Sequence, residues 1–350
     1  MVQMRTVSVK GGLLLGRAVC YHALVITKNE AVTKMAELTQ KSRSGFAAIV
    51  GRPNVGKSTL LNRILGEKIA ITSQRPQTTR NKILGIKTQG LDQLVLLDTP
   101  GIHRQRAHLN RLMVQEALKT LQGVDCILLV TEVARGGSNE KQAVEPMPLV
   151  LHPADSYVLE QIQIQDAKAP VIVVINKIDR IKDRQLLLPL MAAWHDKGFS
   201  TIVPLSALKG DGIEDLLQEI MSLMPEGPHL YPEDMFTDQT ERFLASELIR
   251  EQVFEHCRQE IPYATAVEIL EFRERPDRSA ITIEAIIHME KDSQKAILIG
   301  KGGATIKQLG MAARQEIGKV LGCTVHLQLT VHVEKDWSRF PVQRRKFGYE

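Results

Sequence analysis

The chain has 350 residues, of which 43% are apolar and 24% charged, and a formal net charge of +5. This length suits two domains, and no apolar run approaches the roughly 18–20 residues that a membrane-spanning helix needs. The four cysteines lie far apart, which argues against a disulfide framework or a zinc site, while the basic excess favours an anionic partner, nucleic acid or a membrane surface.

The start of the chain differs from the rest. Four basic residues precede the first acid, Glu30, and the apolar run at 13–15 is short for a secretory signal. We interpret residues 1–44 as an N-terminal extension with a mis-assigned start and expect Met35 to be the true initiator; a targeting segment is the alternative.

From residue 45 onwards, apolar strands alternate with helices. The predicted strands are 46–50, 83–88, 94–97, 126–131, 171–175 and 201–205, and the predicted helices are 57–65, 109–120, 158–163, 186–194 and 213–223. This alternation is typical of a mostly parallel sheet with helices on both faces, so we expect an α/β domain over 45–224. Residues 145–153 contain three prolines and show neither helical nor strand periodicity, which predicts an inserted loop. We assign no role to the insertion, taken as residues 136–153.

A proline-rich stretch predicts a semi-rigid linker over 225–239. The predicted order beyond it is a helix at 241–257, strands at 264–272 and 279–288, two helices around 300–303 and a strand at 324–333. This order indicates an α+β domain over 240–335. Residues 336–350 form a tail that interleaves basic and aromatic residues.

A phosphate loop stands between the first strand and the first helix, where GRPNVGKS matches GxxxxGK[ST]. Its backbone N–H groups and the helix N-terminus would surround phosphates. Lys57 is expected to reach the β- and γ-phosphates and Ser58 to ligate Mg²⁺. The predicted contacts are Gly51, Arg52, Pro53, Asn54, Val55, Gly56, Lys57, Ser58 and Thr59. The loop alone does not separate a kinase, an ATPase and a GTPase.

The motif Asn176–Asp179 follows a predicted strand, at the edge where open α/β sheets bind ligands. Asp179 can accept hydrogen bonds from guanine N1–H and the 2-amino group, whereas adenine would leave this carboxylate unpaired. The other predicted base contacts are Asn176, Lys177, Ile178, Ser206 and Ala207. Together with the phosphate loop, this motif predicts GTP binding.

The motif Asp98-Thr99-Pro100-Gly101 ends another strand. Asp98 is expected to hold Mg²⁺ through water, and the Gly101 N–H to contact the γ-phosphate. Residues 77–80 suit a switch loop, in which Thr79, with Thr78 as the alternative, would join the Mg²⁺ shell only while the γ-phosphate is present. The predicted catalytic residues are Lys57, Thr79, Asp98 and Gly101, and the predicted metal ligands are Ser58, Thr79 and Asp98.

Ile102 occupies the position where many GTPases place a water-orienting glutamine. An isoleucine cannot hydrogen-bond water, so we expect slow intrinsic hydrolysis, with the water oriented by backbone, a cation or a partner. Asn54 is a candidate for holding K⁺ beside the phosphates. We interpret His103 and His108 as polar surface rather than general bases.

The segment ILIGKGG at 297–303 lies between two predicted helices. A GxxG turn by itself is weak and often only joins helices, but the surrounding element order favours RNA binding, because such a turn lets the backbone approach about four nucleotides. The predicted RNA contacts are Gly300, Lys301, Gly302, Gly303 and Lys307. The basic, aromatic tail supports this interpretation, because cations bind phosphates and aromatic rings stack on bases.

The segments GRPNVGKSTL, TSQRPQTTR, LDTPGIH, NKID, YPEDMFTDQTERFLASELIRE and IGKGGATIKQLG occur in the order of the Era family of GTPases, which the chain resembles over roughly 45–349. The resemblance implies a P-loop GTPase domain followed by a type II KH domain. It implies hydrolysis of GTP to GDP and phosphate, binding to 16S rRNA near its 3′ end and a role in maturing the small (30S) ribosomal subunit. It also implies a cytoplasmic protein in loose contact with the inner membrane, and we expect a monomer.

Three other classes share part of this pattern. A tRNA-modification GTPase would share the cation-assisted site but lacks the KH-like module, and it stays the alternative. A small-molecule kinase has no use for NKxD, and a non-enzymatic RNA-binding module would not need Lys57 and Asp98. Nucleotide preference, measured with and without the rRNA 3′ end, would separate these classes.

Overall fold

The computed structural model describes residues 42–73, 75–104, 108–135 and 149–349. The expectations for residues 1–41 and for most of the 136–153 insertion therefore lie outside the described residues. Within the described part of the chain, no helix has both the length and the apolar character that crossing a bilayer requires.

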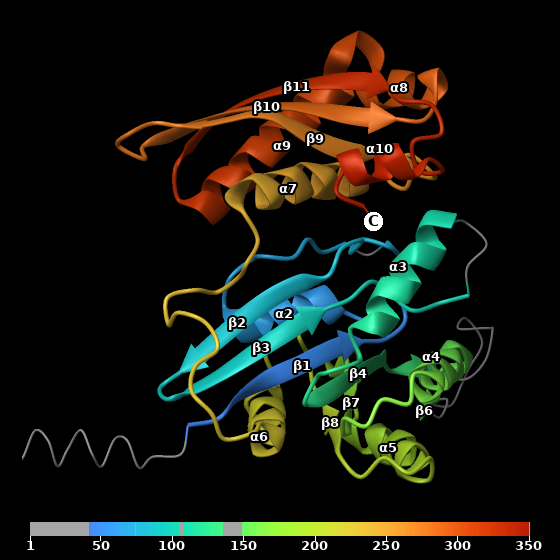
Figure 1. The fold of residues 1–350 in the computed structure, drawn as a ribbon. Helices are drawn as coiled ribbons and strands as arrows, with labels where there is room; N and C mark the ends of the chain where they lie inside the picture. Colours follow the sequence, from blue (N-terminus) through green and yellow to red (C-terminus); the bar gives the residue numbers. More distant parts are fainter. Residues whose placement is uncertain (1–41, 74, 105–107, 136–148, 350) are drawn as a thin grey trace, which may run out of the picture. The chain divides into compact units, whose positions relative to one another are not determined.

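The first domain is built on a six-stranded sheet with the order β2-β3-β1-β4-β7-β8 (Figure 1). The strands are β1 (Ser44–Val50), β2 (Ile83–Gln89), β3 (Asp92–Asp98), β4 (Cys126–Glu132), β7 (Val171–Asn176) and β8 (Ile202–Pro204). All neighbours pair in parallel except β2, which is antiparallel to β3. Only Gly90 and Leu91 join these two strands, and so short a connection can form only a hairpin. The prediction of a mostly parallel sheet is confirmed.

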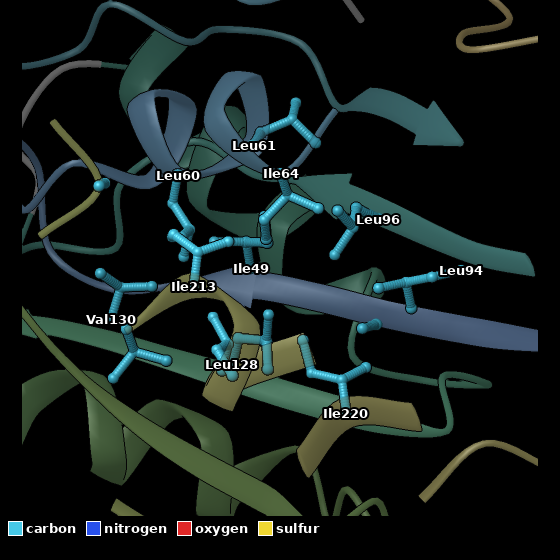
Figure 2. Packing of buried hydrophobic residues seen from close by; sticks show 14 of the residues in the cluster. Ile49, Leu60, Leu61, Ile64, Leu94, Leu96, Leu128, Val130, Ile213 and Ile220 are labelled. Carbon is cyan, nitrogen blue, oxygen red and sulfur yellow. The ribbon is translucent and has the colours of Figure 1, made fainter. Parts of the chain in front are cut away.

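Helices cover both faces of this sheet because side chains alternate along its buried strands. Ala47 and Ile49 of β1 face the core under α2 (Lys57–Leu65) and α6 (Ile213–Leu223), and Figure 2 shows Ile49 among side chains of these two helices. The intervening residues of β1 face a second core, which is covered by α3 (His108–Lys119), α4 (Pro153–Ile164) and α5 (Leu187–His195).

The end of the insertion departs from the sequence prediction. β6 (Leu149–Val150) pairs in antiparallel fashion with β5 (Ala134–Arg135), and α4 begins at Pro153. Proline is favoured in the first helical turn, where its missing N–H would have no partner in any case. The predicted loop over 145–153 therefore extends too far towards the C-terminus, because Pro153 begins a helix and does not belong to the loop.

The linker after α6 is bonded to the first domain along its length. The Ser44 N–H donates to the Pro225 carbonyl at 3.0 Å, and the Ile86 N–H donates to the Phe236 carbonyl at 2.9 Å. Between these points, Gln93 Oε1 accepts the Leu230 and Tyr231 N–H groups at 2.8 and 2.9 Å. Backbone pairing with the sheet, in addition to its prolines, restrains this segment.

The second domain packs three α-helices on a three-stranded sheet with the order β11-β10-β9 (Figure 1). Its elements are α7 (Glu241–His256), β9 (Ala266–Glu274), β10 (Ala280–Met289), α8 (Asp292–Ile299), η3 (Lys301–Gly303), α9 (Ala304–Leu321) and β11 (Thr324–Val333). β10 is parallel to β11 and antiparallel to β9. The predicted helix–strand–strand–helix–helix–strand order is confirmed.

The C-terminal tail carries a short helix, α10 (Pro341–Lys346), and contributes to a buried aromatic cluster. This tail cluster consists of Leu109, Met113, Ala266, Trp337, Phe347 and Tyr349. The expectation that the tail aromatics are available to stack on RNA bases is therefore wrong for Phe347, whereas Phe340 is 52% exposed. Apolar partners from α3 and β9 cover Phe347, and the tail sequence carries no sign of them.

Candidate nucleotide and RNA sites

A cavity of about 560 Å³ opens at the carboxyl edge of the first sheet. It is lined by residues that are distant in sequence but belong to one predicted site, including Lys57, Ser58, Asn176, Asp179 and Ala207. The volume falls in the range of small-molecule and cofactor sites. The β-α connections bring these residues together because the strands are parallel and end at one edge.

The phosphate loop and the guanine motif contact each other directly. Asn176 Nδ2 donates to the Val55 carbonyl at 2.7 Å, and Lys177 Nζ donates to the Asn54 carbonyl at 2.6 Å. Gly56 has φ 100°, and a β-carbon there would lie 2.3 Å from Asn176 Nδ2. Glycine is therefore required at position 56 both for the backbone conformation and for this close approach.

Lys57 is buried beneath the loop, where its ammonium donates to the Gly51 and Arg52 carbonyls at 3.2 Å each. Burial lowers the pKa of Lys57 to about 8, although the neighbouring Asp98 opposes the shift. A bound polyphosphate would supply the negative charge that favours the ammonium form. The loop thus holds a lysine whose charge is best stabilised when phosphates are present.

Three oxygens converge at the predicted metal site. Ser58 Oγ donates to Asp98 Oδ2 at 2.6 Å, and Thr79 Oγ1 lies 2.8 Å from Ser58 Oγ. Burial raises the pKa of Asp98, and its Oδ1 is buried with no hydrogen-bond partner among the described residues. Two hydroxyl oxygens beside a buried carboxylate, one oxygen of which has no hydrogen-bond partner among the described residues, fit Mg²⁺. The Thr78 hydroxyl instead donates to the Arg75 carbonyl at 3.0 Å, so the structure places Thr79 rather than Thr78 at this site.

The guanine end of the cavity is arranged by side-chain hydrogen bonds. Ser206 Oγ donates to Asp179 Oδ1 at 2.6 Å, which orients the carboxylate. The Ala207 N–H, predicted to meet guanine O6, here donates to Asn176 Oδ1 at 2.9 Å. Arg63 Nε, from α2, donates to the Ala207 carbonyl at 2.9 Å. The base-reading loop is thus held by the guanine motif and by the helix that follows the phosphate loop.

Two acidic residues at this site were missed by the sequence analysis. Glu132 Oε1 accepts from Arg52 Nη1 at 2.9 Å, and its other oxygen pairs with Lys177. Asp155 Oδ1 accepts from Arg52 Nε at 3.0 Å. Burial is the largest single influence on Glu132 and opposes its ionisation, but the hydrogen bonds and charges of Lys177 and Arg52 together outweigh burial and lower the pKa of Glu132 overall. A single acidic residue has no characteristic spacing that would identify it in a sequence. Only the position of Glu132 at the carboxyl end of β4 could have indicated that it belongs to the site.

His103 is not the polar surface residue that the sequence suggested. It is half-buried, with Nδ1 2.9 Å from the Gly101 carbonyl and Nε2 3.1 Å from Gln77 Nε2. Burial lowers the pKa of His103, so the ring is neutral, with Nδ1 donating and Nε2 accepting. His103 therefore joins the two segments expected to respond to the γ-phosphate. Ile102 is fully buried in the second core, and the His108 side chain lies outside the described residues.

The predicted RNA contacts lie together at the turn between α8 and α9. Gly300 has φ 75°, and a β-carbon there would lie 2.2 Å from Thr305 Oγ1, which explains why this position needs glycine. Lys301, Gly302 and Lys307 are exposed, and Ile297, just before the turn, is 57% exposed. The turn thus presents an open backbone, one cation within it, a second cation on the helix that follows, and an apolar side chain just before it.

A phosphate loop, a guanine-type carboxylate and a metal-type carboxylate on one α/β sheet, joined to a domain with an exposed GxxG turn, define a GTPase with an RNA-binding module. Comparison with protein families agrees with this class. Residues 46–177 match the family model described as 50S ribosome-binding GTPase, and residues 260–338 match the KH domain model.

The chain is 47% identical over 309 residues to GTPase Era of Geobacter metallireducens, covering 88% of this chain and 98% of the relative. It is 46% identical to GTPase Era of Xylella fastidiosa strain M12, covering 88% and 98%. A variant of Aquifex aeolicus Era bound to GDP and AlF4⁻ superposes with a TM-score of 0.78 at 38% identity, covering 88% of this chain and 99% of that one. Era in complex with MgGDPNP and nucleotides 1506–1542 of 16S ribosomal RNA matches equally well, with the same score, identity and coverage. The chain belongs to the Era family of GTPases.

Proposed function

We propose that this GTPase is a nucleotide-dependent switch that binds 16S rRNA near its 3′ end and assists maturation of the small (30S) ribosomal subunit. The observation that carries the proposal is that one chain combines the guanine-type cavity with the exposed GKGG turn. The similarity to Era in complex with MgGDPNP and an rRNA segment supports it. In this proposal, residues 45–224 act as the GTPase domain and 240–335 as the KH domain, joined by the 225–239 linker.

We assign a part in nucleotide binding or hydrolysis to six of the predicted site residues. The Lys57 ammonium would neutralise charge on the β- and γ-phosphates, and the Gly101 N–H would stabilise the γ-phosphate oxygens as water displaces GDP. Ser58, Thr79 and Asp98 would hold Mg²⁺, which supplies further charge neutralisation. Asp179 would select guanine, because its Oδ1 is already oriented by Ser206.

Orientation of the attacking water would depend on something other than a glutamine, because Ile102 is apolar and fully buried. Asn54, which has φ 64° and a carbonyl bonded to Lys177, is the proposed neighbour of a K⁺ ion. Such an ion would stabilise charge that develops during phosphoryl transfer. Hydrolysis is then expected to be faster in KCl than in NaCl of equal ionic strength; equal rates would exclude the ion.

The switch is tested by measuring affinity for an RNA carrying the 3′-terminal segment of 16S rRNA, by fluorescence anisotropy at constant salt. We expect the GDPNP form to bind this RNA more tightly than the GDP form by a factor of about 5 to 150. Thermodynamic reciprocity then requires the RNA to tighten GDPNP relative to GDP by the same factor. Equal RNA affinity in the two forms would exclude a switch, although hydrolysis would persist.

A matched pair of variants separates the two sites. Lys57→Ala should abolish nucleotide binding or hydrolysis and leave the RNA affinity of the nucleotide-free protein unchanged. Gly302→Asp should do the opposite, because it places a negative charge on the exposed turn, far in sequence from every nucleotide motif. If Lys57→Ala lost RNA binding and Gly302→Asp kept it, the RNA site would lie in the GTPase domain and not in the KH domain.

We also propose a monomeric, cytoplasmic protein in loose contact with the inner membrane. The net charge of +5 favours an anionic surface. Flotation with vesicles of anionic and of neutral lipids tests the contact: the protein should rise only with anionic vesicles and leave them at high salt.

A further inference from the structure

The switch segment, which we define as residues 71–73 and 75–80, bonds directly to the KH domain. The Ile71 side chain is 1% exposed and packs in the core of that domain. The Thr72 N–H donates to Glu251 Oε1 on α7 at 2.8 Å, and the Arg75 guanidinium donates to the Cys257 carbonyl at the end of α7. The switch segment is thus attached to the KH domain at three residues that precede Thr79, the threonine expected to sense the γ-phosphate.

Arg80 ends this segment in a buried pocket of the KH domain. Its Nη1 donates to the Thr265 carbonyl at 2.7 Å, and its Nη2 donates to the Pro262 and Tyr263 carbonyls at 3.1 and 2.9 Å. The residue is only 5% exposed. Burying a guanidinium removes its hydrogen bonds to water, and this is costly unless protein acceptors replace them. Three carbonyls that converge on one side chain therefore form a specific pocket for arginine.

The C-terminal tail closes the pocket. The Arg80 guanidinium lies 5.3 Å from the centre of the Tyr349 ring and 5.9 Å from that of Trp337, within the range of cation–π attraction. Trp337 is fully buried, and its indole N–H donates to the Ala264 carbonyl at 3.0 Å, beside the carbonyl pocket. The tail aromatics therefore stabilise an arginine from the GTPase domain.

Thr79 lies between two points that the KH domain holds. On one side, Arg250 of α7 donates to the Thr78 carbonyl. On the other side is the Arg80 pocket, and Thr79 Oγ1 itself lies 2.8 Å from Ser58 Oγ. Because successive Cα atoms are about 3.8 Å apart and peptide units are stiff, neither neighbour can move far without moving Thr79.

We propose that Arg80 is a positioning residue for Thr79, and that the KH domain and its C-terminal tail thereby determine how well the GTPase domain distinguishes GTP from GDP. This inference rests on the proposed role of Thr79 as the γ-phosphate sensor. The carbonyl pocket holds the threonine close to Ser58 and Asp98, so less ordering is left for GTP to impose. GDP, which lacks the γ-phosphate, gains nothing from this ordering.

The test compares GDPNP and GDP affinities of full-length variants in Mg²⁺, measured by titration calorimetry. Arg80→Ala should weaken GDPNP binding about tenfold and leave the GDP affinity unchanged within about twofold. Lys82→Ala is the matched control, because Lys82 is an exposed cation two residues further along the chain; it should change neither affinity. An equal loss of both affinities, or no change in either, would overturn the proposal.

A second variant tests the tail without touching the switch segment. Tyr349→Leu keeps an apolar side chain but removes the aromatic face under Arg80, and it should reduce the GDPNP-to-GDP preference in the same direction by a smaller factor. Thermal unfolding of the GDP forms shows whether each variant is folded. If the GDPNP and GDP forms of the wild-type protein bind RNA equally, the proposed switch function fails; if their RNA affinities differ but both variants keep the wild-type ratio of GDPNP to GDP affinity, only the role of Arg80 fails.

Discussion

Glu132 shows how one side chain can connect two motifs that are predicted to bind opposite ends of a nucleotide. Its carboxylate accepts from Arg52 of the phosphate loop and pairs with Lys177 of the guanine motif, and it is half-buried. Two cations close together repel each other unless a shared anion lies between them. Glu132 therefore links the phosphate loop to the guanine motif.

Replacing this carboxylate tests that role. Glu132→Gln should weaken GTP and GDP binding equally, by about tenfold, because charge-assisted hydrogen bonds to both cations are lost. Calorimetric titration of both nucleotides measures the change, and Glu160→Gln, on the exposed side of α4, is the control. A loss confined to GTP would show that Glu132 acts on the γ-phosphate instead.

At the scale of elements, His103 joins the loop after β3 to the switch segment. The ring bonds the Gly101 carbonyl and the Gln77 side chain, and this arrangement needs the neutral form. Burial lowers the pKa of His103 below the ordinary value of 6.5, so the unfolded chain takes up a proton first as the pH falls. Stability from this group is present above about pH 6.5 and is lost in the acidic range below it.

The expected result is a free energy of unfolding that falls between about pH 7.5 and about pH 5.5, with a slope from this residue of at most about 1.4 kcal/mol per pH unit. Urea unfolding of the wild-type protein and of His103→Gln at both pH values measures it, and the difference between the two proteins isolates the histidine. Identical pH dependence in both would show that His103 titrates normally.

At the scale of the whole molecule, the tail cluster joins α3 of the GTPase domain to the C-terminus of the KH domain. Met113 and Phe347 are both buried in it. Truncating either side chain should lower the free energy of unfolding by about 2–5 kcal/mol. If the cluster connects the domains, the double variant should depart from additivity by about 0.5–3 kcal/mol.

The double-mutant cycle Met113→Ala and Phe347→Ala, followed by urea unfolding, measures this coupling. The control cycle pairs Phe347→Ala with Met311→Ala, since Met311 on α9 is 44% exposed and lies outside the cluster. The control effects should add. Additive effects in the first cycle would mean that the tail stabilises the KH domain alone.

The sequence by itself determined the fold class, the order of elements and the chemistry of the nucleotide motifs. Phosphate loops and base-reading motifs occupy a few consecutive residues whose local backbone shape performs the function, so Lys57, Asp98 and Asp179 could be predicted from residue order and spacing. The strands and helices were predictable for a related reason, because burial of one face leaves a regular apolar period. α2, α6 and β11 begin and end at the predicted residues.

Only the tertiary structure decided which side chains meet across the chain. Arg52 and Asp155 are 103 residues apart, and Arg80 and Tyr349 are 269 residues apart. Pairing over such distances depends on how whole layers pack and leaves no local period or spacing. The acids beside the phosphate loop, the neutral His103 and the burial of the tail aromatics were therefore missed, and so was the pocket that holds Arg80.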